Sequence, residues 1–372
     1  MKLYIGLMSG TSMDGIDAAL VDVESNRCID GITRPYSSHT KAFLQAVLES
    51  KVNDLKSFSQ LNTVIGQEFA LAANELMARN SQYSTEILAI GSHGQTLCHD
   101  STADIPYTVQ LGCAHVIAEH TGITTVADFR TRDIVAGGQG APFAPIYHQA
   151  LFQTAQLPLA LVNIGGIANL SYLQDKKTVI GYDIGPGNCL MDSWIEKNKN
   201  HSYDTDGLWA ASGQVIHSLL DQLMSDVFFQ RPSPKSIGKE YFSLPWLAHF
   251  LHDGMLAQDI QATLLQLTAL TIAAEIRRLA IEPKQVLICG GGAHNQQLIK
   301  VLANELHDLP LQSTSALGIS ADYLEAMMIA WLAEKTMNDI PLDMSTITGA
   351  KRKAVLGVIY PAGIDKRNSH AV

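Results

Sequence analysis

The sequence predicts an α/β protein of two lobes, related by duplication, around a central cleft. At 372 residues the chain exceeds one average domain, and 47% hydrophobic residues are enough for two buried cores. A strand, a glycine-centred turn and a second strand occur near the N-terminus and again near residue 160. We expect residues 1–140 to form the first lobe, with 345–372 returning to it, and residues 141–344 to form the second.

Each element of the first lobe follows from a local pattern. Residues 3–8 and 16–23 predict the two strands of a hairpin, and residues 60–79 have the apolar spacing of a helix. Residues 87–99 predict a strand that ends in a polar turn. The segment 128–145 is rich in glycine and proline, so we expect it to be irregular and to line the cleft.

The second lobe repeats the opening pattern. Residues 159–173 predict another glycine-tipped hairpin, and residues 179–197 predict a strand, a Gly-Pro turn and a helix. Residues 285–306 predict a buried strand, three glycines and an amphipathic helix. The apolar residues of 316–336 recur at helical spacing, which core packing explains without a cofactor.

Charge and cysteine content exclude several kinds of partner. With 26 Lys and Arg against 36 Asp and Glu, the formal charge is −10, so we expect neither nucleic acid nor a membrane as a partner. A local phosphate site remains open, because backbone amides bind anions without net positive charge. The five cysteines are scattered without a CxxC, which predicts reduced thiols in a cytoplasmic protein.

The turn within MSGTSMDGID, residues 8–17, is the first candidate site. A tight turn needs only one glycine, whereas here two glycines bracket hydroxyl groups and a carboxylate. Such a turn suits phosphate oxygens and a Mg²⁺ ion held through water. We expect nucleotide contacts from Gly10, Thr11, Ser12, Met13, Asp14, Gly15, Ile16 and Asp17, with Asp14 as the metal ligand.

Two further segments leave their roles open. Gly290, Gly291 and Gly292 follow a strand and open a helix, which fits either a ligand at the helix N-terminus or close packing of helix on strand. Asp183 ends a strand beside a Gly-Pro turn, where a carboxylate serves equally well as a general base or as a cap.

Polar side chains in the first lobe suggest ligand contacts rather than a metal site. His93, Cys98 and His99 lack the flanking spacing of metal ligands, so hydrogen bonding in a cleft is the preferred interpretation. Arg130 and Asp133 fit a structural ion pair better than a catalytic one, although their glycine-rich surroundings also suit ligand contact.

The motifs together resemble a known family. The duplicated lobes resemble the acetate and sugar kinase, heat-shock chaperone and actin superfamily, which implies an actin-like (ribonuclease H-like) ATPase fold. Along nearly the whole chain the sequence is similar to the anhydro-N-acetylmuramic acid kinase family. That similarity is carried by MSGTSMDGID, GSHGQT, DFRTRDIVAGGQGAP, NIGGIAN, DIGPGN and the helix containing YLEAM.

The resemblance implies a coupled reaction in peptidoglycan recycling. ATP phosphorylates O6 of 1,6-anhydro-N-acetylmuramic acid while water opens the anhydro bridge, which gives N-acetylmuramic acid 6-phosphate and ADP. The implied cofactors are ATP and Mg²⁺, Asp183 is the implied base, and a homodimer is left open. The resemblance adds Gly165 and Gly166 to the nucleotide contacts and implies sugar contacts from His93, Arg130, Asp133, Asn169 and Glu325.

This sequence departs from the family pattern at several positions. Ile184 and Tyr182 stand where Thr and His are usual, which puts hydrogen bonding around Asp183 in question. Ile237 and Lys239 replace Thr and Arg, and Ile329 replaces Phe. Two rival functions remain open from sequence: an ordinary sugar or small-acid kinase, which would need no anhydro bridge, and a nucleotide-gated binding protein, which would not turn over sugar.

Overall fold

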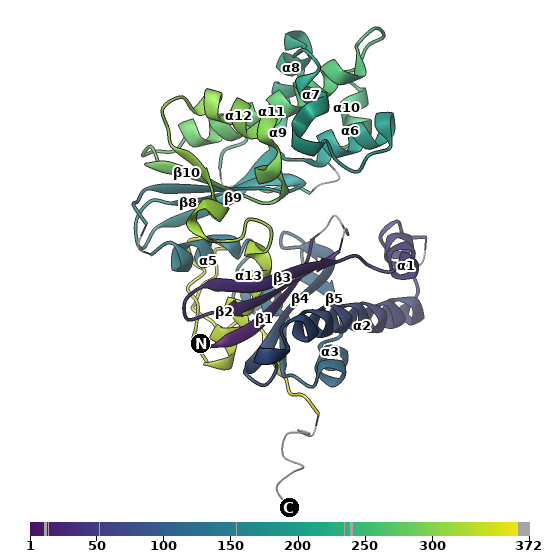
Figure 1. The fold of residues 1–372 in the computed structure, drawn as a ribbon, viewed down its shortest axis with the longest axis vertical. Coiled ribbons are helices and arrows are strands. Elements are labelled where there is room, and N and C mark those ends of the chain that lie inside the picture. Colours follow the sequence, from purple (N-terminus) through teal and green to yellow (C-terminus); the bar gives the residue numbers. More distant parts are fainter. Residues whose placement is uncertain are drawn as a thin grey trace, which may run out of the picture. The chain divides into compact units, whose positions relative to one another are not determined.

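The computed structural model describes residues 1–10, 13, 15–51, 53–153, 155–233, 235–238 and 241–363. It separates into two compact units, each with its own hydrophobic core (Figure 1). The first unit comprises Met1–Phe143 together with the chain from Tyr323 onward, and the second comprises Ala144–Asp322. Within the described residues, no helix is both long enough and apolar enough to cross a membrane.

The first unit is a mixed sheet with helices on both faces. Leu3, Ile5 and Leu7 of its first strand share a core with helix α2, while the intervening Gly6 lies against helix α13. Its elements are β1 (Leu3–Ser9), β2 (Ile16–Asp22), β3 (Arg27–Arg34), α1 (Ser38–Leu48), α2 (Leu55–Arg79), η1 (Ser81–Tyr83), β4 (Ile87–Asp100), β5 (Tyr107–Leu111), α3 (Ala114–Thr121), β6 (Thr125–Ala127), α4 (Phe129–Val135), α13 (Leu324–Met337) and β12 (Val358–Tyr360).

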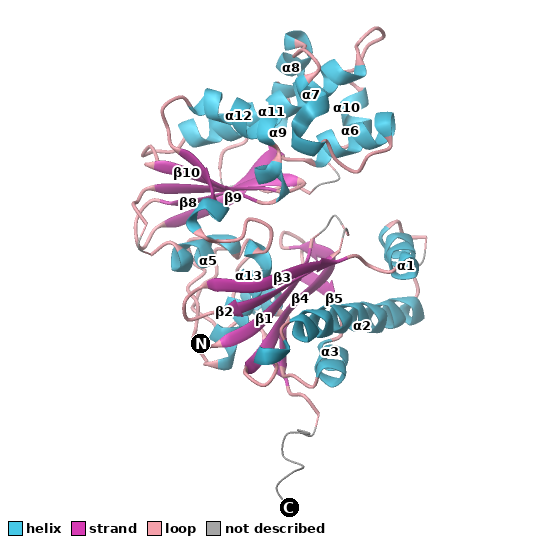
Figure 2. Cartoon of the chain, viewed as in Figure 1, coloured by secondary structure: helices cyan, strands magenta, loops and turns pink. Residues whose placement is uncertain are grey.

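The second unit is also a mixed sheet between helices, as the colouring of Figure 2 shows. Gly181 lies against Pro145 of α5, while Tyr182 and Ile184 enter the core built with α11. Its elements are α5 (Ala144–Leu151), β7 (Leu159–Ile164), β8 (Ile167–Leu173), β9 (Val179–Pro186), α6 (Cys189–Lys199), η2 (Thr205–Gly207), α7 (Leu208–Ala211), α8 (His217–Met224), α9 (Val227–Gln230), α10 (Leu244–Ala248), α11 (Ala257–Arg277), β10 (Gln285–Cys289), η3 (Gly291–His294), α12 (Gln296–Leu306), β11 (Leu311–Ser313) and η4 (Thr314–Leu317).

Five strands of the first sheet have the same order and sense as the five strands of the second, and the first sheet adds β12 beside β6 and β5 beside β4. In the first, β3, β2 and β1 are antiparallel neighbours, and β4 and then β6 continue the sheet in parallel with β1. In the second, β9, β8 and β7 are antiparallel neighbours, and β10 and β11 continue it in parallel with β7. The α/β prediction is confirmed, and the matching strand order and sense support the predicted duplication.

Helix α13 belongs with the first unit, although the sequence analysis expected residues up to 344 in the second. It also begins later than expected, at Leu324, after the 3₁₀ turn η4, which ends at Leu317 with Gly318 as its C-cap. Two glycines explain its place. A Cβ at Gly6 would collide with the backbone of Ala326, and one at Gly91 would collide with the carbonyl oxygen of Ile329. Strands β1 and β4 therefore hold the helix backbone at a distance that only glycine permits.

Two other segments differ from expectation in the first unit. The segment 128–145 is not irregular throughout, because it contains α4 and the start of α5. The expected strand at 87–99 does not end in a polar turn within that range but runs to Asp100 as β4, because β5 pairs with its polar half from Gln95 onward. His93 and Gln95 are thereby placed on β4, on either side of Gly94, whose φ of 74° accompanies a shift in the register between β1 and β4.

Candidate functional site

The first hairpin tip is supported from below by a buried polar cluster. Ser9 Oγ donates to Gln95 Oε1 at 2.8 Å, and Tyr36 OH donates to Ser9 Oγ at 3.0 Å. Gln95 Nε2 in turn donates to Gly10 O at 3.2 Å, so the start of the tip is tied to β4. A Cβ at Gly15 would come within 2.8 Å of Arg34 O, which crowds the end of the tip against β3.

The residues of this tip that were expected to contact the nucleotide differ in which of their groups a ligand could reach. Thr11, Ser12 and Asp14 lie outside the described residues. Met13 has a positive φ of 60° and donates its amide to Gly10 O. Ile16 is fully buried in the core, and Asp17 Oδ1 accepts from Thr33 Oγ1 at 2.6 Å. Of this group, Ile16 has only its backbone to offer a ligand.

The second hairpin ends in Gly165 and Gly166, and helix α6 begins against it. The amides of Gly187 and Asn188 donate to the carbonyl oxygens of Gly166 and Gly165 at 2.9 and 2.8 Å. A Cβ at either tip glycine would meet nothing closer than 3.7 Å. The tip is therefore pinned by its carbonyl groups and keeps an uncrowded outer face.

The three glycines after β10 differ in how closely other atoms approach them. A Cβ at Gly290 would collide with Asn163 Oδ1, and one at Gly292 would collide with Ile164 Cγ2. Gly291 is exposed, and the nearest heavy atom to a Cβ there would be Asn188 Nδ2 at 3.6 Å. Helix α12 begins after a 3₁₀ turn with Asn295 as its N-cap. Gly290 and Gly292 therefore have a packing role, while the outer face of Gly291 is uncrowded.

Asp183 lies on β9 at the edge of the second sheet. It is paired across the sheet with Asn169, which is itself paired with Asn163, so three polar side chains stand side by side. Asp183 Oδ2 accepts a hydrogen bond from the amide of Ile237 at 2.9 Å. Burial raises the pKa of Asp183 to about 6, and the Ile237 hydrogen bond acts in the opposite direction. A carboxyl with that pKa is suited to take a proton near neutral pH.

His93 and Arg130 form a buried pair in the first unit. Arg130 Nε donates to His93 Nε2 at 3.0 Å, so His93 Nδ1 carries the proton and donates to Gly94 O at 2.9 Å. Burial, with the nearby Arg130 charge, lowers the pKa of His93 to about 3. Burial lowers the pKa of Arg130 to about 10, while the charge of Glu325 acts to raise it. A neutral histidine and a charged arginine thus stand together with Glu325 nearby.

The expected ion pair between Arg130 and Asp133 does not form. Both residues lie on α4, but Asp133 Oδ2 accepts from the amide of Gly140 at 2.7 Å and Oδ1 accepts from Thr348 Oγ1 at 2.9 Å. Asp133 is 1% exposed, and burial raises its pKa. Its observed contacts tie the glycine-rich segment 137–140 to the chain near Thr348, while Arg130 turns to His93.

The described residues contain no group of three or more His, Cys, Asp or Glu side chains that could hold a metal ion. His93, Cys98 and His99 accordingly do not form one. The metal ligand expected from sequence, Asp14, lies outside those residues.

The departures near Asp183 are placed unambiguously. Ile184 is fully buried in the core on the opposite face of β9, so it does not meet the Asp183 carboxylate. Tyr182 shares that face, and its hydroxyl donates to Glu275 Oε2 at 3.3 Å. Ile329 is fully buried in α13. Lys239 lies outside the described residues.

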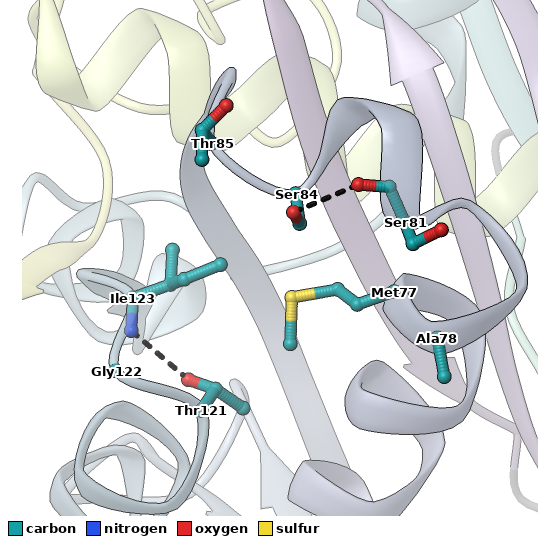
Figure 3. Close-up of a pocket in the computed structure, with 8 residues that line it drawn as sticks. All are labelled: Met77, Ala78, Ser81, Ser84, Thr85, Thr121, Gly122 and Ile123. Atoms are coloured by element: carbon teal, nitrogen blue, oxygen red, sulfur yellow. Dashed lines mark hydrogen bonds between the residues drawn. The ribbon is translucent and has the colours of Figure 1, made fainter.

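A pocket in the first unit lies away from all of these residues (Figure 3). Its polar side chains are hydroxyl groups only, and Ser84 Oγ and Thr121 Oγ1 already hydrogen-bond to Ser81 O and the amide of Ile123. It contains none of the residues expected from sequence. The lining residues are Met77, Ala78, Ser81, Ser84, Thr85, Thr121, Gly122 and Ile123.

Sequence reasoning missed the residues that support the site. Ser9, Tyr36 and Gln95 converge from β1, the β3–α1 connection and β4. Ser9 and Gln95 lie in motifs singled out beforehand, but neither was expected to support the tip, and Tyr36 lies in no such motif. Ile237 binds Asp183 from a segment 54 positions away. No local pattern marks such a contact, because it depends on the fold of the intervening chain.

Comparisons with known proteins identify one family over nearly the whole chain. The family model described as anhydro-N-acetylmuramic acid kinase matches residues 2–362. The anhydro-N-acetylmuramic acid kinase of Legionella pneumophila (strain Corby) is 56% identical over 97% of this chain and 99% of its own, and that of Aliivibrio fischeri is 45% identical over 97% and 100%. Component A of the (R)-2-hydroxyglutaryl-CoA dehydratase of Acidaminococcus fermentans is a remote structural match, with 12% identity, 89% and 97% coverage and a TM-score of 0.49.

Proposed function

The chain belongs to the anhydro-N-acetylmuramic acid kinase family, and from this premise we propose that Asp183 is the base that activates water in its reaction. The protein is an ATP-dependent kinase for anhydro-N-acetylmuramic acid in peptidoglycan recycling. Family membership therefore favours this activity over an ordinary sugar kinase or a nucleotide-gated binding protein.

The substrate dictates an unusual role for a base. In an ordinary sugar kinase the base takes the proton of the hydroxyl that attacks the γ-phosphate. O6 of the anhydro sugar is an ether oxygen and has no such proton. In the proposed reaction, water attacks C1 and gives a proton to the carboxylate, the C1–O6 bond breaks, and O6 takes the γ-phosphoryl group of ATP. ADP leaves, and the product is N-acetylmuramic acid 6-phosphate.

The placement of Asp183 is the observation that carries the proposal. Burial raises the pKa of this carboxyl to about 6, so it is mostly ionised at pH 7 yet strongly basic for a carboxylate. One oxygen is fixed by the amide of Ile237, and among the described residues no hydrogen bond occupies Oδ1. That oxygen is the one we assign to the attacking water.

The glycines suit a nucleotide on geometric grounds. Gly291 is exposed before the N-terminus of α12, and the Gly165–Gly166 tip has an uncrowded outer face. We assign phosphate contacts to this tip and to the first hairpin tip, with Asp14 holding Mg²⁺ through water. Bound Mg²⁺ would neutralise phosphate charge. The collisions at Gly290 and Gly292 make these two glycines packing residues beside that site.

The sugar contacts are assigned to Arg130, His93 and Glu325 of the first unit and to Asn169 of the second. Arg130 remains charged despite burial and has further guanidinium donors beyond the Nε that binds His93. Glu325 is half-buried at the first turn of α13 and offers a carboxylate for sugar hydroxyl groups. We assign Asn169 to the sugar as well, because it is the strand neighbour of Asp183. For Asp133 the contacts favour a supporting role over direct binding.

We also propose a cellular location and an oligomeric state. We place the protein in the cytoplasm, where ATP is available and its five free cysteines would stay reduced. We leave a homodimer as the oligomeric state to be tested by analytical ultracentrifugation.

Isotope labelling tests the proposed route of the water. The protein is incubated with ATP, Mg²⁺ and the anhydro sugar in ¹⁸O-water, and the product is fragmented in a mass spectrometer. The label is expected at C1 and absent from the phosphate. Label in the phosphate would mean that water attacks phosphorus, and the proposal would then be wrong.

A further inference from the structure

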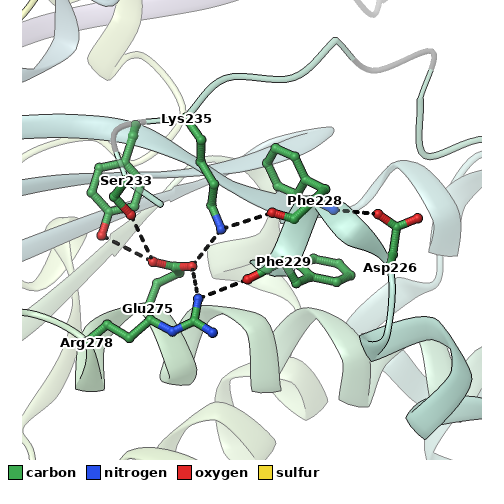
Figure 4. A network of polar contacts seen from close by, with 8 residues as sticks. Asp226, Phe228, Phe229, Ser233, Lys235, Glu275 and Arg278 are labelled. Carbon is green, nitrogen blue, oxygen red and sulfur yellow. Dashed lines mark hydrogen bonds and ion pairs between the residues drawn. The ribbon is translucent and has the colours of Figure 1, made fainter. Parts of the chain in front are cut away.

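A buried polar network joins Ser233 and Lys235 to Glu275 of helix α11 (Figure 4). Its centre is an ion pair in which Lys235 Nζ donates to Glu275 Oε1 at 2.7 Å, with side chains only 3% and 4% exposed. Removing two charges from water is costly, and apolar residues of similar size often stabilise a protein as well or better. Stability alone therefore does not account for this pair.

Glu275 is hydrogen-bonded at both carboxylate oxygens. Arg278 Nη1 donates to Oε1 at 2.8 Å and also to Phe229 O at 3.1 Å. At Oε2 the donors are Tyr182 OH at 3.3 Å and Ser233 Oγ at 3.4 Å. Glu275 is thereby held in one orientation by donors from β9, from α11 itself and from the segment that contains Lys235.

Lys235 is held equally firmly. Besides Glu275, its ammonium group lies 3.5 Å from Phe228 O and 4.8 Å from the centre of the Phe228 ring. A lysine side chain has many rotamers, and these contacts restrict it to one. The backbone at residue 235 is therefore anchored to the core through its own side chain.

The backbone of this same segment holds Asp183. The amide of Asp183 donates to Lys235 O at 2.9 Å, so the segment continues the hydrogen bonding of β9 along the sheet edge. Two residues later, the amide of Ile237 donates to Asp183 Oδ2 at 2.9 Å. The position of the carboxylate thus depends on where residues 235–237 lie.

We propose that Lys235, fixed by Glu275, is a positioning residue that holds residues 235–237 against β9 and so aims the Asp183 carboxylate. It does not touch the reacting atoms. This inference rests on the proposed function of Asp183, and it explains what fixes the orientation of the Asp183 carboxylate.

Loss of the pair has a distinctive consequence for pH dependence. The Ile237 hydrogen bond opposes the burial that raises the pKa of Asp183, so freeing the segment raises that pKa further. A base works only when deprotonated, and the acidic limb of the rate profile should therefore move to higher pH, by roughly one unit. The described titratable groups on the elements packed against this part of β9 include Tyr182 on β9, Tyr172 on β8, Tyr147 and His148 on α5, and Lys235, Glu275 and Arg278.

The test compares three variants with the parent. Lys235→Met removes the charge and keeps the length of the side chain. Lys235→Met combined with Glu275→Met leaves no unpaired buried charge. Leu264→Ala, a fully buried position on α11 remote from the pair, is the control for lost stability alone. For each we would measure Tm, kcat, the KM of both substrates, and kcat between pH 5 and 8.

We expect Lys235→Met to lose at least tenfold in kcat with both KM values within threefold of the parent, and its acidic limb to move upward. The double variant should recover Tm but not kcat, and Leu264→Ala should lower Tm without moving the acidic limb. Parental kcat in Lys235→Met, or recovery of kcat in the double variant, would overturn the positioning role. Asp183→Asn is measured in parallel. If Asp183→Asn keeps the parental kcat, the proposed role of Asp183 as the base is wrong. If Asp183→Asn loses kcat while Lys235→Met keeps it, only the positioning role of Lys235 is rejected.

Discussion

Asp183 should cost the protein stability, and Asp183→Asn should therefore be more stable than the parent. Burial raises the pKa of this carboxyl from 3.8 to about 6. That shift corresponds to up to about 3 kcal/mol of unfolding free energy at 1.36 kcal/mol per pH unit. Asn has nearly the same shape, carries no charge and can still accept from the Ile237 amide. At pH 7.5 we expect the variant to melt a few degrees higher.

The pH dependence gives this prediction its sign. Above pH 6 the folded protein holds an ionised, poorly solvated carboxylate, so the destabilisation is fully present there. As the pH falls through 6 the folded form takes up a proton, and below 3.8 the unfolded chain does so too, which removes the difference. Thermal melts of the parent and of Asp183→Asn between pH 3.5 and 8 measure this difference in stability. If Asp183→Asn is less stable than the parent at pH 7.5, or if the difference in stability does not shrink as the pH is lowered, burial of the carboxylate does not destabilise the protein and the reasoning is wrong.

Three further predictions follow from the site. Arg130→Met should raise the sugar KM at least tenfold and the ATP KM less than threefold in steady-state kinetics; equal effects would point to a folding role. Gly290→Ala should lower Tm because its Cβ meets Asn163 Oδ1 and Ile164 O, whereas Gly291→Ala should keep the parental Tm and weaken only nucleotide binding in calorimetry. Excess EDTA should abolish turnover, and added Mg²⁺ should restore it; turnover without divalent metal would contradict the proposed metal.

The sequence predicted the parts of the molecule that depend on local pattern. Alternating apolar residues around glycine turns located both hairpins, and both sheets then have the order that duplication implies. Contacts between distant segments were not accessible in this way. An Arg130–Asp133 ion pair was expected from the sequence, but Thr348, which lies 215 residues from Asp133, is one of that carboxylate's actual partners. Similarly, α13 was expected to pack in the second unit, because nothing local connects it with Gly6 and Gly91.

The candidate base illustrates the same division. A strand followed by a Gly-Pro turn was enough to single out Asp183, while its role as base or cap stayed undecided. The burial and the Ile237 contact that favour the base come from packing and from a segment remote in sequence. The Lys235–Glu275 pair joins residues 40 positions apart. The departures at Ile237 and Lys239 drew attention to the segment after Lys235, but nothing in the sequence connected it with Glu275.

A single-turnover experiment with Asp183→Asn tests the central claim most directly. Enzyme in excess over radiolabelled anhydro sugar is mixed with ATP and Mg²⁺, and opened sugar and phosphorylated sugar are measured in the same quenched samples. General-base assistance is worth about 10²–10⁴-fold, so both products should appear more slowly by that factor and in step with each other, with sugar and ATP affinity little changed. Asp175→Asn, an exposed carboxylate on the β8–β9 turn, is the matched control and should react at the parental rate. Near-parental rates for Asp183→Asn, or phosphorylation that proceeds without ring opening, would contradict the account.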